Sequence, residues 1–123
     1  MKLIVENTLS DLFTDRYITY RIEKVNDVYD ALKSKNYPEH LDRRGTFVSL
    51  IGLLKEVLKE MNKKYKDIYP TGEYRADVMR LNNYSDKFTK EWSPYNEDVF
   101  GDLFIREVEA LFNRFEKLGY PFK

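Results

Sequence analysis

The sequence contains no cysteine, and its single histidine is His40. Without cysteine there is no disulfide and no thiolate metal site, a composition that fits a reducing compartment. His40 has no cysteine to activate and lies in a segment next to Pro38, so no nucleophile–histidine pair is indicated. The sequence also has no glycine-rich loop of the kind that holds phosphates. These absences favour a protein without catalytic activity.

Long apolar runs are absent as well. No stretch of about 18 apolar residues is present, so no membrane span is expected. The N-terminal stretch reaches an acidic residue at Glu6, too early for a signal peptide. Hydrophobic residues make up 42% of the 123 residues, enough for one domain with a core, and charged residues make up 34%. We therefore expect a soluble, cytoplasmic protein that is not associated with a membrane.

Two long amphipathic ladders dominate what is present. In both, apolar residues recur at the i, i+3, i+4, i+7 spacing that places them on one face of an α-helix. The first ladder consists of Phe47, Leu50, Ile51, Leu54, Val57, Leu58, Met61, Tyr65 and Ile68. The second consists of Val99, Phe100, Leu103, Phe104, Val108, Leu111, Phe112, Phe115 and Leu118. Two such helices predict an all-α fold.

Breaks in the pattern divide the chain into four helices. Pro38, Pro70 with Gly72, and Pro94 mark the three connections. The predicted helices span residues 11–35, 43–69, 73–92 and 96–118. Ser10 is the expected N-cap of the first helix, and Asn96 that of the fourth. Four helices of similar length with short connections predict a single-domain antiparallel bundle over residues 1–123.

Two segments have an alternative. Residues 3–5 (Leu-Ile-Val) are apolar and could form a short N-terminal strand or an extended arm. Residues 17–22 are rich in aromatic and β-branched residues and alternate, which is also typical of a strand. The 3–4 rhythm from Ile18 to Leu32 favours a continuous helix across this segment.

The connection between the third and fourth helices carries the main candidate binding site. Trp and Tyr are enriched at binding hot spots, and this connection holds one of each among acidic residues. The C-terminus adds two further aromatic residues. The predicted protein-binding residues are Trp92, Tyr95, Glu97, Asp98, Tyr120 and Phe122. A homo-oligomer is an alternative use of the surplus apolar surface.

Nucleic-acid binding is a second hypothesis. Residues 33–66 hold nine basic against four acidic residues, and the lysines recur along one face of the second helix. The residues concerned are Arg43, Arg44, Lys55, Lys59, Lys63 and Lys66. Such a stripe could follow phosphates, although the sequence pI of about 6.6 is low for a nucleic-acid binder.

A third hypothesis is a Mg²⁺-dependent nucleotide hydrolase of the all-α type. Acid pairs share a helix face at 27 and 30, 56 and 60, and 98 and 102. Sequestration of a nucleotide by arginines is a related reading, which draws on Arg75, Arg80, Arg106 and Arg114. Neither has a motif behind it, and we predict no metal and no cofactor.

The interpretation that these patterns favour is a small non-catalytic protein that binds another macromolecule stoichiometrically, as an inhibitor, adaptor or assembly subunit. A short helical chain rich in Lys, Asn and Tyr and free of cysteine is typical of phages and mobile elements. Proteins of that kind often act by binding and blocking a host macromolecule.

Overall fold

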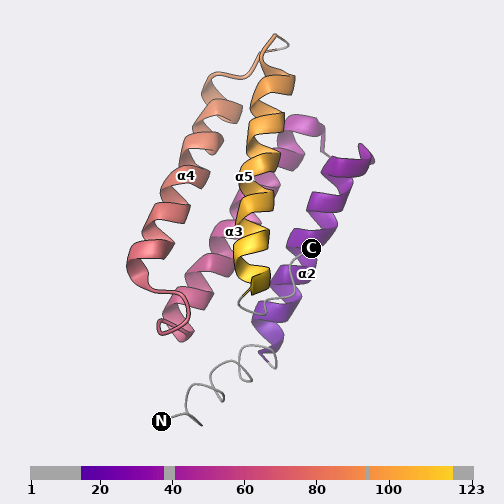
Figure 1. Ribbon diagram of the computed structural model, residues 1–123. Coiled ribbons are helices and arrows are strands. Elements are labelled where there is room, and N and C mark those ends of the chain that lie inside the picture. The colour runs from indigo at the N-terminus through magenta and orange to yellow at the C-terminus, as the bar shows by residue number, and fades with distance from the viewer. Residues whose placement is uncertain (1–14, 38–40, 94, 118–123) are drawn as a thin grey trace.

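The computed structural model describes residues 15–37, 41–93 and 95–117, and it confirms the all-α prediction (Figure 1). The four helices are α2 (Arg16–Ser34), α3 (Arg43–Lys64), α4 (Thr71–Lys90) and α5 (Glu97–Lys117). No strand occurs within these ranges. The predicted strand at residues 3–5, the Ser10 cap, Tyr120 and Phe122 all lie outside the described residues.

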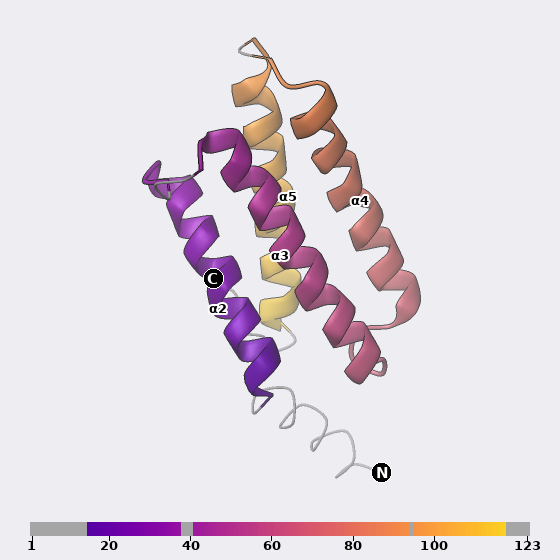
Figure 2. The same cartoon turned by 180° about the vertical axis from the view of Figure 1, so that it is seen from behind.

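Successive helices run antiparallel, as the short connections predict (Figures 1 and 2). Each helix packs beside the next one in sequence order. Helix α3 makes the most extensive contacts of the four, with α2 on one side and α4 on the other. The fourth side of the bundle is closed between α2 and α5. There the ring of Tyr29 meets the edge of Phe112, with ring centroids 5.0 Å apart.

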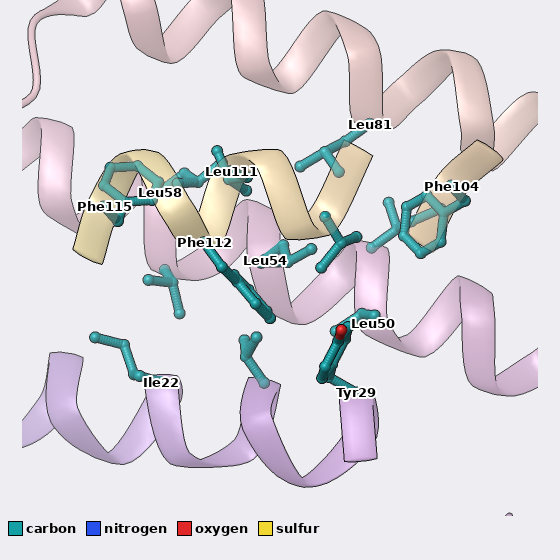
Figure 3. Close-up of a cluster of buried hydrophobic side chains, with 14 of the residues drawn as sticks. Ile22, Tyr29, Leu50, Leu54, Leu58, Leu81, Phe104, Leu111, Phe112 and Phe115 are labelled. Atoms are coloured by element: carbon teal, nitrogen blue, oxygen red, sulfur yellow. The ribbon is translucent and has the colours of Figure 1, made fainter. Parts of the chain in front are cut away.

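The core lies along the axis of the bundle and draws side chains from all four helices (Figure 3). Helix α3 contributes the most, because seven members of the first ladder are fully buried. They are Phe47, Leu50, Ile51, Leu54, Val57, Leu58 and Met61. Opposite them, Phe104, Phe112 and Phe115 project from α5. Burial of this much apolar surface is the main stabilising contribution to the fold.

Helix α2 is continuous through residues 17–22, which confirms the helical prediction over the strand. Its N-cap is Asp15, whose carboxylate accepts a hydrogen bond from the N–H of Ile18 at 3.1 Å. Ile18 and Ile22 are buried one turn apart, whereas Tyr17 lies on the exposed side. The helix is favoured over the strand because the helical period places every large aliphatic side chain of the segment in the core.

Helix α3 ends at Lys64, earlier than the predicted residue 69. The side-chain amide of Asn62 donates to the carbonyl of Tyr69 at 3.0 Å and to Oγ1 of Thr71 at 3.2 Å. These bonds require the chain to turn back after Lys64, and the turn buries Tyr69 completely. Long-range hydrogen bonding therefore overrides the apolar pattern at Tyr65 and Ile68.

Helix α2 begins at Arg16 rather than at the predicted residue 11, because the chain is extended at its N-cap Asp15. The remaining boundaries shift by at most two residues. Helix α4 begins at Thr71 after Pro70 and ends at Lys90, against a prediction of 73–92. Arg44 of α3 donates to the carbonyls of Phe88 and Thr89, which are among the orphan acceptors at the end of α4. Helix α5 spans 97–117 against the predicted 96–118, and Leu118 lies outside the described residues.

Two residues of the second ladder are not in the core. Val99 is 57% exposed and Leu103 is 41% exposed. The apolar residues of this ladder extend around more of α5 than the neighbouring helices cover. Val99 and Leu103, at the edge of the apolar face, therefore remain in solvent.

Gly101 permits a close approach of α5 to α3. A Cβ at this position would lie 3.0 Å from the ring of Phe47 and 3.1 Å from the guanidinium of Arg43. Both distances are shorter than ordinary van der Waals contact. The glycine thus fixes how deeply α5 sits on the start of α3, next to the connection that carries the candidate site.

Candidate functional site

The loop between α4 and α5 presents one fully exposed aromatic side chain. Tyr95 is 97% exposed. Trp92, three residues earlier, is half-buried and packs on Phe88 and Phe47, with ring centroids 5.4 and 6.4 Å apart. Trp92 thus anchors the loop to the core, while Tyr95 is the residue available to a partner.

Hydrogen bonds within the loop hold it in one shape. The side chain of Asn96 accepts from the N–H of Ser93 at 2.9 Å and donates to the carbonyl of Glu91 at 2.7 Å. Its backbone carbonyl accepts from the N–H of Phe100. Asn96 therefore directly precedes α5, at the predicted N-cap position, and its side chain joins the start of the helix to Ser93 and Glu91, which both come before Tyr95.

An ion pair joins the first turn of α5, directly after the loop, to α3. Arg43 donates to the carboxylate of Asp98 at 2.7 Å, and this hydrogen bond lowers the pKa of Asp98 below its usual value. Arg43 is a predicted nucleic-acid residue and Asp98 a predicted protein-binding residue, so the structure joins the two predicted surfaces at this point. Glu97 begins α5, and its side chain is outside what the structure describes.

The predicted basic face of α3 divides into two parts. Arg43 and Arg44 are engaged by Asp98 and by the end of α4. The remaining members are Lys55, which is partly exposed, and Lys59, Lys63 and Lys66, which are exposed. None of these four lysines forms an ion pair with a carboxylate in the described ranges. They make a cationic strip on α3 and the turn after it, which we call the lysine strip.

The predicted acid pairs do not form a common cleft. Glu56 pairs with Arg21 of α2 at 3.1 Å, and Glu60 lies 3.7 Å from Lys64. Asp98 is engaged by Arg43, and Asp102 is exposed on α5. The described residues contain no group of three or more His, Cys, Asp or Glu side chains arranged to hold a metal ion.

A buried polar cluster between α4 and α5 is absent from the sequence-based predictions. Asp77 is only 3% exposed, and its carboxylate accepts from the hydroxyl of Tyr69 at 2.6 Å and from Arg114 at 2.7 Å. Arg80 adds a third hydrogen bond at 3.2 Å. One signal was available in the sequence: Asp77 falls between Tyr74 and Leu81, on the apolar stripe of its helix.

Burial and charge shift the titration of this cluster. Burial, and then the hydrogen bond to Asp77, raise the pKa of Tyr69 well above its usual value. Burial, the largest single effect, would lower the pKa of Arg114, but the hydrogen bond to Asp77 and the negative charges of Asp77 and Glu73 together raise it. Tyr69 therefore remains a neutral donor and Arg114 a cation, which is what a buried carboxylate needs.

A hollow of about 480 Å³, including the space at its open mouth, lies beside this cluster. It separates α4 from α5, with Leu81 and Leu111 among its apolar walls. Arg80, Arg114 and Glu107 provide charges of both signs around it. Because Arg114 is already held by Asp77 and Glu73, the polar groups here mainly join the two helices.

No helix in the described ranges is long and apolar enough to cross a bilayer. In comparisons with models of protein families, with curated protein sequences and with solved structures, the chain matches none of them.

Proposed function

We propose that this protein acts in the cytoplasm as a non-catalytic binding protein that engages another protein stoichiometrically through the α4–α5 loop. The observation that carries the proposal is the 97% exposure of Tyr95 directly before Asn96, whose side chain is hydrogen-bonded to Ser93 and Glu91. Inhibitor, adaptor and assembly subunit are the roles that such a surface serves.

The contacts made by Trp92, Asn96 and Asp98 support this proposal. Ordering side chains and loops on binding costs about 0.5–1.5 kcal/mol for each flexible side chain. Trp92 on the core, Asn96 within the loop and the Arg43–Asp98 pair have already ordered the segment around Tyr95. A tyrosine presented in this way supplies a large contact area and a hydroxyl at low entropic cost.

We expect Tyr95→Ala to weaken binding of the partner at least about 30-fold, the effect of losing a hot-spot side chain. The tagged wild-type protein is used to capture partners from a lysate of the native host, with and without nuclease, followed by mass spectrometry. The affinity of the captured protein for both variants is then measured by calorimetry.

Tyr20→Ala is the matched control, because Tyr20 is also an exposed tyrosine (52%) but lies on α2. It should leave the affinity unchanged, and circular dichroism should show the same helix content in all variants. Equal affinity of the wild-type protein and Tyr95→Ala for every captured partner would rule out the loop as the contact.

A second candidate function, nucleic-acid binding, is favoured by one observation: the lysine strip has no carboxylate partners in the described ranges. If it binds nucleic acid, log K should fall linearly with log salt, by about 0.7–0.9 for each phosphate neutralised. Fluorescence anisotropy with single- and double-stranded oligonucleotides measures this slope. Lys59→Glu with Lys63→Glu should reduce the slope by about two, and binding that is independent of salt would contradict this candidate.

A further inference from the structure

The outer face of α5 is exposed along most of its length and carries apolar side chains near its N-terminal end. Val99 and Leu103 lie one helical turn apart, at 57% and 41% exposure. Asp102, Arg106 and Ala110 are also exposed and continue the same side of the helix toward its C-terminal half. This surface, Val99, Asp102, Leu103, Arg106 and Ala110, is called the α5 face below.

The two exposed tyrosines of α2 are covered by cationic side chains, whereas Val99 and Leu103 are not. Arg21 and Lys64 lie over the ring of Tyr17 at 5.0 and 5.3 Å, and Lys24 lies over Tyr20 at 5.2 Å. Those contacts shield the rings with charge from within the same chain. Val99 and Leu103 are aliphatic and cannot be shielded in this way, so an apolar partner surface would remove their side chains from water.

The α5 face carries one negative and one positive side chain, so the α5 faces of two copies can be complementary in charge. Asp102 and Arg106 are one turn apart, yet they form no ion pair with each other or with another described residue. Comparable i, i+4 pairs elsewhere do close, with Glu60–Lys64 at 3.7 Å and Asp86–Lys90 at 3.5 Å. Both charges of the α5 face are therefore available to a second molecule.

A two-fold axis that passes between Asp102 and Arg106 brings both the charged and the apolar residues of the α5 face into contact with a second copy. Two α5 helices then run antiparallel, and each Asp102 lies opposite the Arg106 of the second copy. Measured along the helix axis, Val99 of each copy is offset by about 1.5 Å from Ala110 of the second copy. The small side chain of Ala110 permits a close approach at this point. The Leu103 side chains of the two copies meet near the axis.

From this complementarity we infer that the α5 face is a homodimer interface, occupied by a second copy of this chain in antiparallel orientation. The inference is independent of binding by the α4–α5 loop, and the antiparallel arrangement places the two loops at opposite ends of the paired helices. One helix face buries less than the total of about 1,600 Å² typical of stable complexes, so the dimer dissociates in the range of about 1 μM to 1 mM.

Sedimentation equilibrium of the purified full chain over a concentration series tests the inference. The wild-type protein should shift from monomer to dimer within that range. Leu103→Glu, which places like charges near the axis, should raise the dissociation constant at least about tenfold. Asp86→Lys on α4, a charge reversal of an exposed acid away from the α5 face, is the matched control and should dimerise as the wild type does.

Charge exchange between two variants provides the decisive comparison. Asp102→Arg alone and Arg106→Asp alone should each be monomeric, because every dimer then contains two repulsive contacts. An equimolar mixture of the two should dimerise again, since both contacts of the mixed dimer become attractive. A wild-type protein that is monomeric at all concentrations, single variants that dimerise normally, or a mixture that stays monomeric would each overturn the inference. Unchanged circular dichroism of the variants excludes unfolding as the cause.

Discussion

Phe88→Ala is expected to lower the free energy of unfolding by about 3–5 kcal/mol, the range for removing a fully buried aromatic side chain. Phe88 has no exposed surface and stacks on Phe47 with ring centroids 4.6 Å apart. It also meets Phe104 edge-on at 5.5 Å and supports Trp92 at 5.4 Å. The substitution leaves a cavity that these rigid rings cannot fill by small movements.

The measurement is urea denaturation followed by the fluorescence of Trp92, the only tryptophan of the chain, and by circular dichroism. A domain of this size has a total stability of about 5–15 kcal/mol, so the loss removes a large part of it. Phe88→Leu keeps most of the apolar volume and should cost less than Phe88→Ala. A loss below about 1.5 kcal/mol for Phe88→Ala would show that the aromatic cluster at the top of the bundle is not packed as described.

Asp77→Ala is expected to lower the free energy of unfolding by about 3 kcal/mol, the lower end of the range for breaking a buried ion pair. The carboxylate is buried, and its removal deprives the buried hydroxyl of Tyr69 and the guanidinium of Arg114 of their shortest hydrogen bonds. The lower end applies because Arg114 is more than one third exposed, so solvent screens part of its charge.

A double-mutant cycle separates the ion pair from simple loss of packing. The cycle compares Asp77→Leu alone, Arg114→Leu alone and the combination of the two substitutions. Asp77→Leu alone leaves Arg114 without its main partner, whereas the double variant removes both charges. We expect the double variant to be more stable than Asp77→Leu alone, measured by urea denaturation. If the two substitutions are additive, Asp77 and Arg114 do not stabilise each other, and the cluster has another role.

Much of the fold could be predicted because the chain has few competing signals. The ladder from Phe47 to Met61 allows only a helix, and seven of its members are buried as expected. The prolines at 38, 70 and 94 separate the elements, because proline cannot continue a helix through its interior. Even the ambiguous segment at 17–22 follows its helical period.

Periodicity gives the direction of an apolar face but not the width of the surface that covers it. Val99 and Leu103 belong to the ladder, yet α3 and α4 do not extend far enough around α5 to bury them. Conversely, Asp77 is buried because Tyr69 and Arg114, eight and 37 residues away, supply its hydrogen bonds. No local pattern carries that information.

The candidate site also combines features that the sequence indicated with features that only the packing of the helices decided. Composition alone identified the aromatic loop and the basic stripe. Only the packing separated Trp92, which is held by Phe88 and Phe47, from Tyr95, which is fully exposed. Likewise, Arg43 and Asp98 form an ion pair only because α5 lies close to α3, and Gly101 permits this close approach.

By itself, the sequence determined the fold class, the four helices and the side of each helix that faces the core, because these follow from local spacing and from residues that end helices. Tertiary structure decided which charged and aromatic residues remain available to a partner. Availability depends on contacts between residues far apart in the chain, and those contacts exist only after the helices have packed.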